Sequence, residues 1–221
     1  GRVLLILDVN HVLCERHPSH CAPPSEAQRA SHAHTQLRPG CYVWERPYAA
    51  LFVEWCMRHF AVALWSSGAR RNIEPIVQHV LPKALRAHLA FIWCQEECTT
   101  DAQKDAPAGV GGSERKPLLL KELRRVWQRW PQWGPQSTLL VDDDPIKCER
   151  NPPHTAIHPA KWRALRPPEG SQLELAPQGL LATYLEAVHA APDTQAHVAA
   201  NTYVAPGAEA AAEDGGHSDH D

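Results

Sequence analysis

The sequence predicts an α/β domain in which a mainly parallel sheet carries helices on both faces. Short apolar runs alternate along the chain with longer stretches whose apolar positions recur at helical spacing. This alternation is typical of right-handed strand–helix–strand crossovers. The first apolar run, residues 3–8, ends abruptly on a carboxylate, Asp8. Because open α/β sheets place their chemistry at the carboxyl ends of the strands, we expect functional residues at that edge.

The apolar runs and the helical periods divide the chain into an ordered series of elements. Strands are predicted at 3–8, 61–65, 89–93 and 137–141, with short β pieces at 41–44 and 155–158. The helical patterns comprise a helix that begins at Pro47, a helix over 70–88 broken near Pro82, an amphipathic helix over 116–130 and a closing helix over 175–189.

The stretches between these elements differ in composition from the core. Residues 14–41 are rich in Pro, Ser, His and Ala and predict a surface insertion, and residues 99–115 are polar and Gly-rich and predict a flexible loop. From about residue 191 the chain has almost no core-forming residues, which predicts disorder. We therefore predict a domain over 1–190 and a disordered tail over 191–221.

Bulk composition excludes several classes of protein. The 221 residues allow one sizeable domain or two small ones, and 43% apolar and 21% charged residues are ordinary for a globular protein. A formal net charge of −3 argues against direct nucleic-acid binding, and no apolar run is long enough to span a membrane. The chain starts with Gly directly before a core strand, so we interpret it as a fragment whose targeting segment could be missing.

Cysteine and histidine provide weak metal-site candidates. The seven cysteines are irregularly spaced without a CxxC pair, which predicts a reduced, intracellular protein, nuclear or cytoplasmic. Cys94 and Cys98 are better interpreted as core or loop thiols than as metal ligands. The histidines gathered in one loop and in the tail are better interpreted as solvated side chains; they are His17, His20, His32, His34, His217 and His220.

The strongest signal is a set of polar residues at predicted strand ends and on one helix. Taken singly, each has an ordinary structural explanation, such as a turn, a cap or a solvated charge. The set comprises Asp8 and Asn10, Ser66, Lys121 on the predicted 116–130 helix, and Asp142 with Asp143. Three adjacent carboxylates, Asp142–Asp144, repel one another at the end of a core strand unless a cation is near, which favours a metal site.

These motifs, in this order, resemble the FCP/SCP-type phosphatase domain, also called the NLI-interacting-factor-like domain, of the haloacid dehalogenase (HAD) superfamily. The similarity covers roughly residues 3–190, and the run Asn151–Ile157 is similar to plant and algal members. The motifs are Leu4–Asn10, Trp44–Tyr48, Ala63–Gly68 with Glu74 and Pro75, Lys116–Leu123, and Leu139–Pro145.

The resemblance implies a Rossmann-like HAD fold with short insertions instead of a large cap, and it implies roles for the site residues. Asp8 is expected to be the nucleophile that forms an aspartyl phosphate. Mg²⁺ is expected to bind the Asp8 carboxylate, the backbone carbonyl of Asn10, and Asp142 or Asp143. Ser66 is expected to hydrogen-bond a phosphoryl oxygen. Lys121 is expected to contact both Asp8 and the phosphate, with Lys116 as the less favoured alternative.

The chain departs from the family pattern at Asn10, where active members carry a second carboxylic acid. That acid protonates the leaving alcohol and then activates water, whereas an amide cannot transfer a proton at neutral pH. General acid–base catalysis contributes about 10²–10⁴-fold, so a slow enzyme is expected. The neighbouring His11 is a weak candidate for replacing the lost acid, because its side chain is expected to point elsewhere.

The leading hypothesis is a Mg²⁺-dependent phosphatase that acts on phosphoserine or phosphothreonine in a protein. The main alternative is a catalytically impaired pseudophosphatase that serves as a protein-interaction module. A nucleotide or sugar-phosphate hydrolase is a third class, less favoured because short insertions predict an open site. Neither the substrate nor the oligomeric state follows from the sequence.

Overall fold

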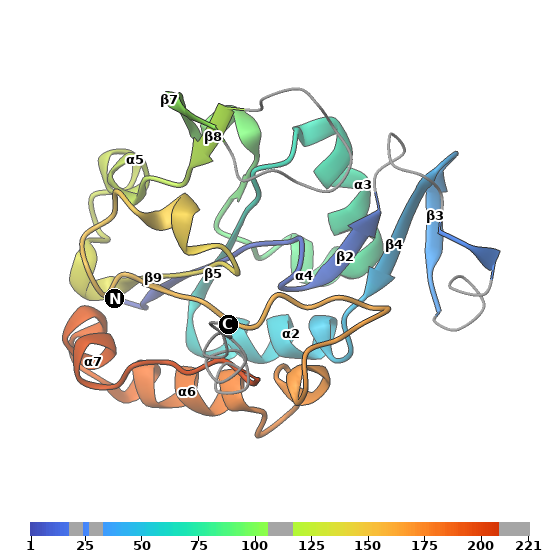
Figure 1. Ribbon diagram of the computed structural model, residues 1–221. Coiled ribbons are helices and arrows are strands. Elements are labelled where there is room, and N and C mark those ends of the chain that lie inside the picture. The colour runs from blue at the N-terminus through green and yellow to red at the C-terminus, as the bar shows by residue number, and fades with distance from the viewer. Residues whose placement is uncertain (18–23, 27–32, 106–116, 208–221) are drawn as a thin grey trace, which may run out of the picture.

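The computed structural model describes residues 1–17, 24–26, 33–105 and 117–207 of the chain. Its centre is a five-stranded parallel sheet with the order β10-β9-β1-β5-β6, which confirms the predicted α/β class (Figure 1). The strands are β1 (Leu4–Leu7), β5 (Ala61–Trp65), β6 (Ile92–Trp93), β9 (Thr138–Val141) and β10 (Ala156–Ile157).

The central strands are buried on both faces, which explains their continuous apolar runs. In β1, Leu5 and Leu7 face one core and Leu4 and Ile6 face the other. The first core is shared with α2 (Ala49–His59), α3 (Arg70–Val80), α6 (Leu180–Ala190) and α7 (Thr194–Ala200). The second core is covered by α5 (Leu123–Arg129), which lies across the sheet from α2, α6 and α7 in Figure 1.

Short helices complete the described fold. They are α4 (Lys83–Arg86) and the 3-10 turns η1 (Gln95–Glu97), η2 (Pro135–Ser137), η3 (Pro145–Cys148) and η4 (Ser171–Leu173). In the parts of the chain that the structure describes, no helix has the length and apolar character needed to cross a membrane.

Two small antiparallel sheets lie where the sequence predicts a surface insertion and a flexible loop. The first has the order β2-β4-β3, formed by Cys14–His17, Cys41–Glu45 and Thr35–Arg38. The second pairs β7 (Thr99–Asp105) with β8 (Pro117–Leu120). Part of each predicted irregular segment is therefore ordered strand. Among the described residues, the insertions are these short strands and not a large cap domain.

The predicted helix over 116–130 is wrong over residues 117–122. Pro117–Leu120 form β8, in which Leu118 and Leu120 are buried while Pro117 is exposed, and helix α5 begins only at Leu123. The alternating burial of these four residues and their pairing with β7 favour a strand, although apolar residues recur at helical spacing over residues 116–130. Lys121 consequently follows the end of a strand and does not lie on a helix.

The chain after residue 190 differs from the predicted disordered tail as far as residue 207. Helix α7 begins at Thr194 and is capped by Asp193, whose carboxylate accepts a hydrogen bond from the Ala196 N–H at 2.9 Å. Thr194 and Val198, four residues apart, are buried on one side of the helix. The apolar face of α7 is small, because the helix contains alanines and only one larger apolar residue, Val198. The composition of this segment therefore does not reveal the helix. Residues 208–221 of the predicted tail lie outside the described residues.

Candidate active site

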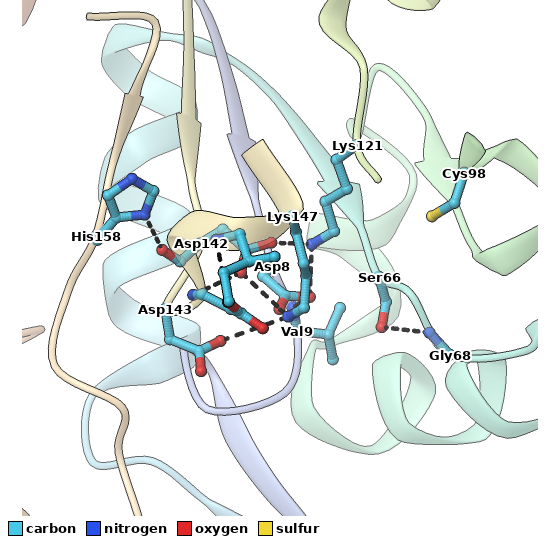
Figure 2. A network of polar contacts seen from close by, with 12 residues as sticks. Asp8, Val9, Ser66, Gly68, Cys98, Lys121, Asp142, Asp143, Lys147 and His158 are labelled. Carbon is cyan, nitrogen blue, oxygen red and sulfur yellow. Dashed lines mark hydrogen bonds and ion pairs between the residues drawn. The ribbon is translucent and has the colours of Figure 1, made fainter. Parts of the chain in front are cut away.

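The register of the central sheet brings the predicted site residues to one edge. Leu7 at the end of β1 pairs with Leu64 of β5 and with Val141 of β9. The residues that follow, Asp8 and Asp142, therefore leave adjacent strands at the same level. Ser66 follows β5 at the same edge, and Figure 2 shows all three residues around one group of polar contacts.

Three carboxylates form the centre of this edge. Ligand oxygens of Asp8, Asp142 and Asp143 all lie within 4.8 Å of one another. The Asp143 side chain is only 1% exposed, and neither of its oxygens accepts a hydrogen bond from any residue that the structure describes. A buried carboxylate without hydrogen bonds is costly, and hard oxygen donors are the ligands that Mg²⁺ prefers. The donor set therefore fits a divalent cation held by these three side chains.

Lys121 contacts two of the carboxylates directly. Its fully buried ammonium lies 3.1 Å from Asp8 Oδ1 and 2.5 Å from Asp142 Oδ2. Burial alone would lower the pKa of Lys121, but Asp142 and Asp8 outweigh it and the pKa is raised. Lys121 is therefore a fixed positive charge beside Asp8. The alternative residue, Lys116, lies outside the described residues.

Asn151 positions the backbone on both sides of Lys121. Its side-chain amide donates to the Lys121 carbonyl at 2.8 Å, and its side-chain oxygen accepts from the Leu123 N–H at 2.8 Å. The turn between β8 and α5 is thereby tied to the segment that follows η3. This bidentate contact sets the point from which the Lys121 side chain enters the carboxylate cluster.

Lys147 is a second cation in the cluster, and the sequence reasoning missed it. Its ammonium lies 3.4 Å from Asp8 Oδ2, 3.2 Å from Asp142 Oδ1 and 3.9 Å from Asp143 Oδ1. The tight turn η3, capped where the Asp144 carboxylate accepts from the Ile146 N–H at 3.2 Å, returns Lys147 to the acidic residues before it. The sequence feature that could have predicted this position is Lys147 four residues after Asp143, with Pro145 between them favouring a tight turn. The repulsion expected among Asp142–Asp144 is thus offset by cations of the protein itself.

The two consecutive carboxyl groups that follow β9, Asp142 and Asp143, have opposite pKa shifts. Burial tends to raise both, but Lys121 and Lys147 dominate at Asp142 and lower its pKa to about 2. At Asp143 burial dominates and raises the pKa to about 6, although Lys161 lies 3.3 Å from Asp143 Oδ2. Asp142 is therefore the firmly ionised member of the pair, and it is positioned further by His158, whose ring nitrogen lies 2.8 Å from the Asp142 carbonyl.

Asn10 and His11 have their side chains engaged with backbone groups outside the carboxylate cluster. Asn10 Oδ1 accepts a hydrogen bond from the Arg16 N–H at 2.9 Å, which closes the turn between β1 and β2. His11, with a φ of 66°, places its Nδ1 2.9 Å from the Trp162 carbonyl, and burial lowers its pKa. His11 therefore points toward the Trp162 segment, in agreement with the orientation expected from the sequence.

Ser66 lies at the end of β5 with 2% of its surface exposed. Its hydroxyl oxygen accepts a hydrogen bond from the Gly68 N–H at 3.2 Å, so its own hydrogen can be donated to another group (Figure 2). The Ile73 side chain packs closely over Gly68, because a Cβ atom on Gly68 would lie 2.6 Å from Ile73 Cδ1 and that side chain would have to move. The Ser66–Gly68 turn thus holds the hydroxyl at the edge of the sheet where Asp8 lies.

Comparison with known families identifies the domain. The family model described as NLI interacting factor-like phosphatase matches residues 3–195. The chain belongs to this family. The comparison with curated proteins finds no match.

Solved structures similar to this NLI interacting factor-like domain are distant in sequence. One, titled as the fission yeast RNA polymerase II CTD phosphatase Fcp1-R271A bound to beryllium fluoride, has 12% identity and a TM-score of 0.47 over 83% of this chain. Another, titled as Fcp1, an essential RNA polymerase II CTD phosphatase, has 13% identity and a TM-score of 0.48 over 73% of this chain. The similarity spans only 45% and 42% of those chains, respectively.

Where the structure describes them, the other metal-ligand candidates of this NLI interacting factor-like domain are not part of the carboxylate cluster. Cys94 and Cys98 are buried, Cys98 Sγ lies 3.6 Å from the Cys94 carbonyl oxygen, and burial raises the pKa of each thiol to about 11. The ring of His34 packs against Tyr42 and Trp44. The remaining loop and tail histidines, apart from His17, fall outside the described residues; they are His20, His32, His217 and His220.

Proposed function

We propose that this domain is a Mg²⁺-dependent phosphatase that hydrolyses phosphoserine or phosphothreonine in protein substrates through an aspartyl phosphate at Asp8. The observation that carries the proposal is the placement of Asp8. Its buried carboxylate has one oxygen 3.1 Å from Lys121 Nζ and lies within 4.8 Å of the ligand oxygens of Asp142 and Asp143. Membership of a phosphatase family supports a phosphorylated protein as the substrate.

The reaction requires two displacements at phosphorus. A carboxylate oxygen of Asp8 forms a bond to phosphorus, the bond from phosphorus to the serine or threonine oxygen breaks, and that oxygen takes a proton. Water then forms a bond to phosphorus and gives up a proton to solvent, and the bond from phosphorus to the Asp8 oxygen breaks, which releases inorganic phosphate and restores the Asp8 carboxylate. Lys121 balances charge on Asp8 and on the phosphoryl group, and the Ser66 hydroxyl donates to a phosphoryl oxygen.

The metal ion belongs to the same proposal. The carboxylates of Asp8 and of Asp142 or Asp143, together with the backbone carbonyl of Asn10, would hold Mg²⁺. When bound, the ion neutralises negative charge on the phosphoryl oxygens. The carbonyl at position 10 is a main-chain group, so the substitution of the usual acid by Asn10 leaves that ligand in place.

Asn10 makes the proposed enzyme slow on alkyl phosphates. Its side chain accepts a hydrogen bond from the Arg16 N–H and carries no proton that it can release at neutral pH. The leaving alkoxide must therefore take its proton from water. An aryl phosphate, whose leaving group is a weak base, needs no such help and is the substrate of choice for detecting activity.

The direct test is turnover of an aryl phosphate with and without Mg²⁺ by the wild-type protein, Asn10→Asp and Asp8→Asn. Asp144→Asn serves as a matched control, because Asp144 caps η3 and is not part of the carboxylate cluster. We expect Mg²⁺-dependent turnover by the wild type, Asn10→Asp and Asp144→Asn, and none by Asp8→Asn. Absence of turnover by both the wild type and Asn10→Asp would reject the enzymatic function.

The second candidate function is a protein-interaction module. It is favoured by the contacts of Asn10 and His11, both of which are engaged with backbone groups and not with Asp8. Such a module would bind a phosphopeptide or a partner protein equally well in the wild type and in Asp8→Asn. Binding that is unchanged by Asp8→Asn, combined with absent turnover, would select this function over catalysis.

A further inference from the structure

We propose that the Lys147 ammonium competes with the divalent metal ion for the carboxylates of Asp8, Asp142 and Asp143, and acts as their internal counter-ion when no metal is bound. The inference rests on the metal site of the proposed function, and it does not depend on the phosphatase reaction. It assigns a role to a residue that the catalytic scheme above does not use.

The geometry places Lys147 among the metal-ligand oxygens. Its Nζ lies 3.4, 3.2 and 3.9 Å from one oxygen each of Asp8, Asp142 and Asp143, and Figure 2 shows its side chain ending between them. A magnesium ion bound by oxygens takes ligands at about 2.0–2.1 Å, so an ion held by these oxygens would lie in the space that the ammonium fills. The two cations therefore exclude each other.

Exposure shows which of the two buried cations can leave. The Lys147 side chain is 17% exposed, whereas the side chains of Asp8, Asp142, Asp143 and Lys121 are each at most 2% exposed. Lys147 is thus the solvent-facing member of this group. Lys121 is enclosed on all sides. An entering metal ion therefore displaces Lys147 and leaves Lys121 in contact with Asp8.

Charge balance supports the exchange. The three carboxylates carry three negative charges when ionised, and Lys121 and Lys147 supply two positive charges. Of the three carboxylates, Lys161 forms an ion pair with Asp143, at 3.3 Å, and its side chain is 46% exposed. A divalent ion that displaces Lys147 replaces one positive charge by two at the same oxygens. Because like charges in a buried site repel strongly, Lys147 weakens metal binding as long as its ammonium remains in place.

The test is calorimetric titration of Mg²⁺ into the wild-type protein, Lys147→Met and Lys147→Arg. We expect Lys147→Met to bind Mg²⁺ at least about 10-fold more tightly, a change of about 1.4 kcal/mol. Lys147→Arg keeps the charge and should bind close to wild type. Lys161→Met is the comparison variant, and we expect a change of at most about 5-fold because exposed ion pairs contribute little.

A second measurement follows the same variants without metal. In a chelator, Lys147→Met should melt at a lower temperature than the wild type, because three buried carboxylates keep only Lys121 as a buried counter-ion. Added Mg²⁺ should raise its melting temperature by more than it raises that of the wild type. If Lys147→Met does not fold in the chelator, Lys147→Gln provides the same comparison with a polar side chain.

Equal or weaker Mg²⁺ affinity in both Lys147→Met and Lys147→Gln would overturn the proposal, and so would absence of metal binding in every variant. Failure of the proposed phosphatase function is a separate outcome. It would leave the Mg²⁺ affinities and their dependence on Lys147 intact, while the wild type and Asn10→Asp turn over no aryl phosphate.

Discussion

The backbone N–H of Lys121 donates a hydrogen bond to the carbonyl of Lys147 at 2.8 Å. The two lysines whose side chains approach Asp8 and Asp142 therefore come from two adjoining backbone segments, the end of β8 and the turn η3. A shift of either segment would move both ammonium groups relative to the carboxylates. The residues that hold these segments together are thus expected to control both stability and the site.

Asn151→Ala should destabilise the domain by about 1–3 kcal/mol, because it removes two hydrogen bonds and leaves the Lys121 carbonyl and the Leu123 N–H without that partner. Urea denaturation of the metal-free protein measures the loss. The control is Asn201→Ala, at the exposed residue that follows α7 and donates from its side chain to the His197 carbonyl, with an expected change within about 0.5 kcal/mol. Equal losses in the two variants would contradict the positioning role of Asn151.

Asn10→Asp should raise kcat on a phosphoserine peptide by about 10²–10⁴-fold, because a carboxyl group at this position can protonate the leaving alkoxide and then activate water. The aspartate can still accept the hydrogen bond from the Arg16 N–H, so the turn should persist. The increase should be smaller on an aryl phosphate. Steady-state rates on both substrates measure the difference, and an equal increase on the two would argue against an acid–base role.

The buried ion pair of Arg46 with Glu174 links the end of β4 to the segment that precedes α6, because Arg46 directly follows that strand, and Tyr203 donates to the same carboxylate. Both side chains of the pair are 0% exposed, so Arg46→Met should cost about 3–5 kcal/mol by leaving Glu174 uncompensated. The double variant Arg46→Met/Glu174→Leu should recover much of this loss. Denaturation curves of the single and double variants provide the measurement.

An exposed ion pair supplies the control for Arg46. Arg58 and Glu54 lie one turn apart on α2 with side chains 65% and 46% exposed, so Arg58→Met should cost less than about 1 kcal/mol. If Arg46→Met/Glu174→Leu is no more stable than Arg46→Met alone, the cost of the Arg46 substitution comes from lost packing and not from the unpaired Glu174 carboxylate.

Cys94 and Cys98 should resist alkylation in the folded protein. Burial raises the pKa of each thiol to about 11, so at pH 8 the reactive thiolate is a small fraction, and both side chains are shielded from reagent. Labelling with iodoacetamide, followed by mass spectrometry of each peptide, tests this, and labelling in urea is the control. Rapid native labelling of either residue would contradict its interpretation as a core thiol.

The sequence was most informative where one physical cause acts over a few neighbouring residues. The run Leu4–Leu7 is apolar throughout because both of its faces are covered, and the carboxylate after it marks the end of the strand at the functional edge. The helix from Ala49 and the strand Ala61–Trp65 follow equally local patterns. Such elements can be predicted because their own side chains decide them.

The sequence was misleading where a partner strand or a distant core decides the structure. Leu118 and Leu120 fit a helical window as well as a strand, and only pairing with β7 makes them β8. Helix α7 forms because Val198 packs against a core built by other segments. In both cases the deciding contact involves residues that a local window does not contain.

By itself, the sequence determined the parallel α/β architecture and the positions of the acidic residues at strand ends, because apolar runs and the residues that end them are local patterns. It also determined the family to which the domain belongs, because the motifs and their order can be read along the chain. Only the tertiary structure decided that Lys121 and Lys147 share the same carboxylates and that Asn10 binds a backbone N–H. Those contacts depend on the register of strands and on a turn that reverses the chain, and they arise only when segments distant in the sequence pack together.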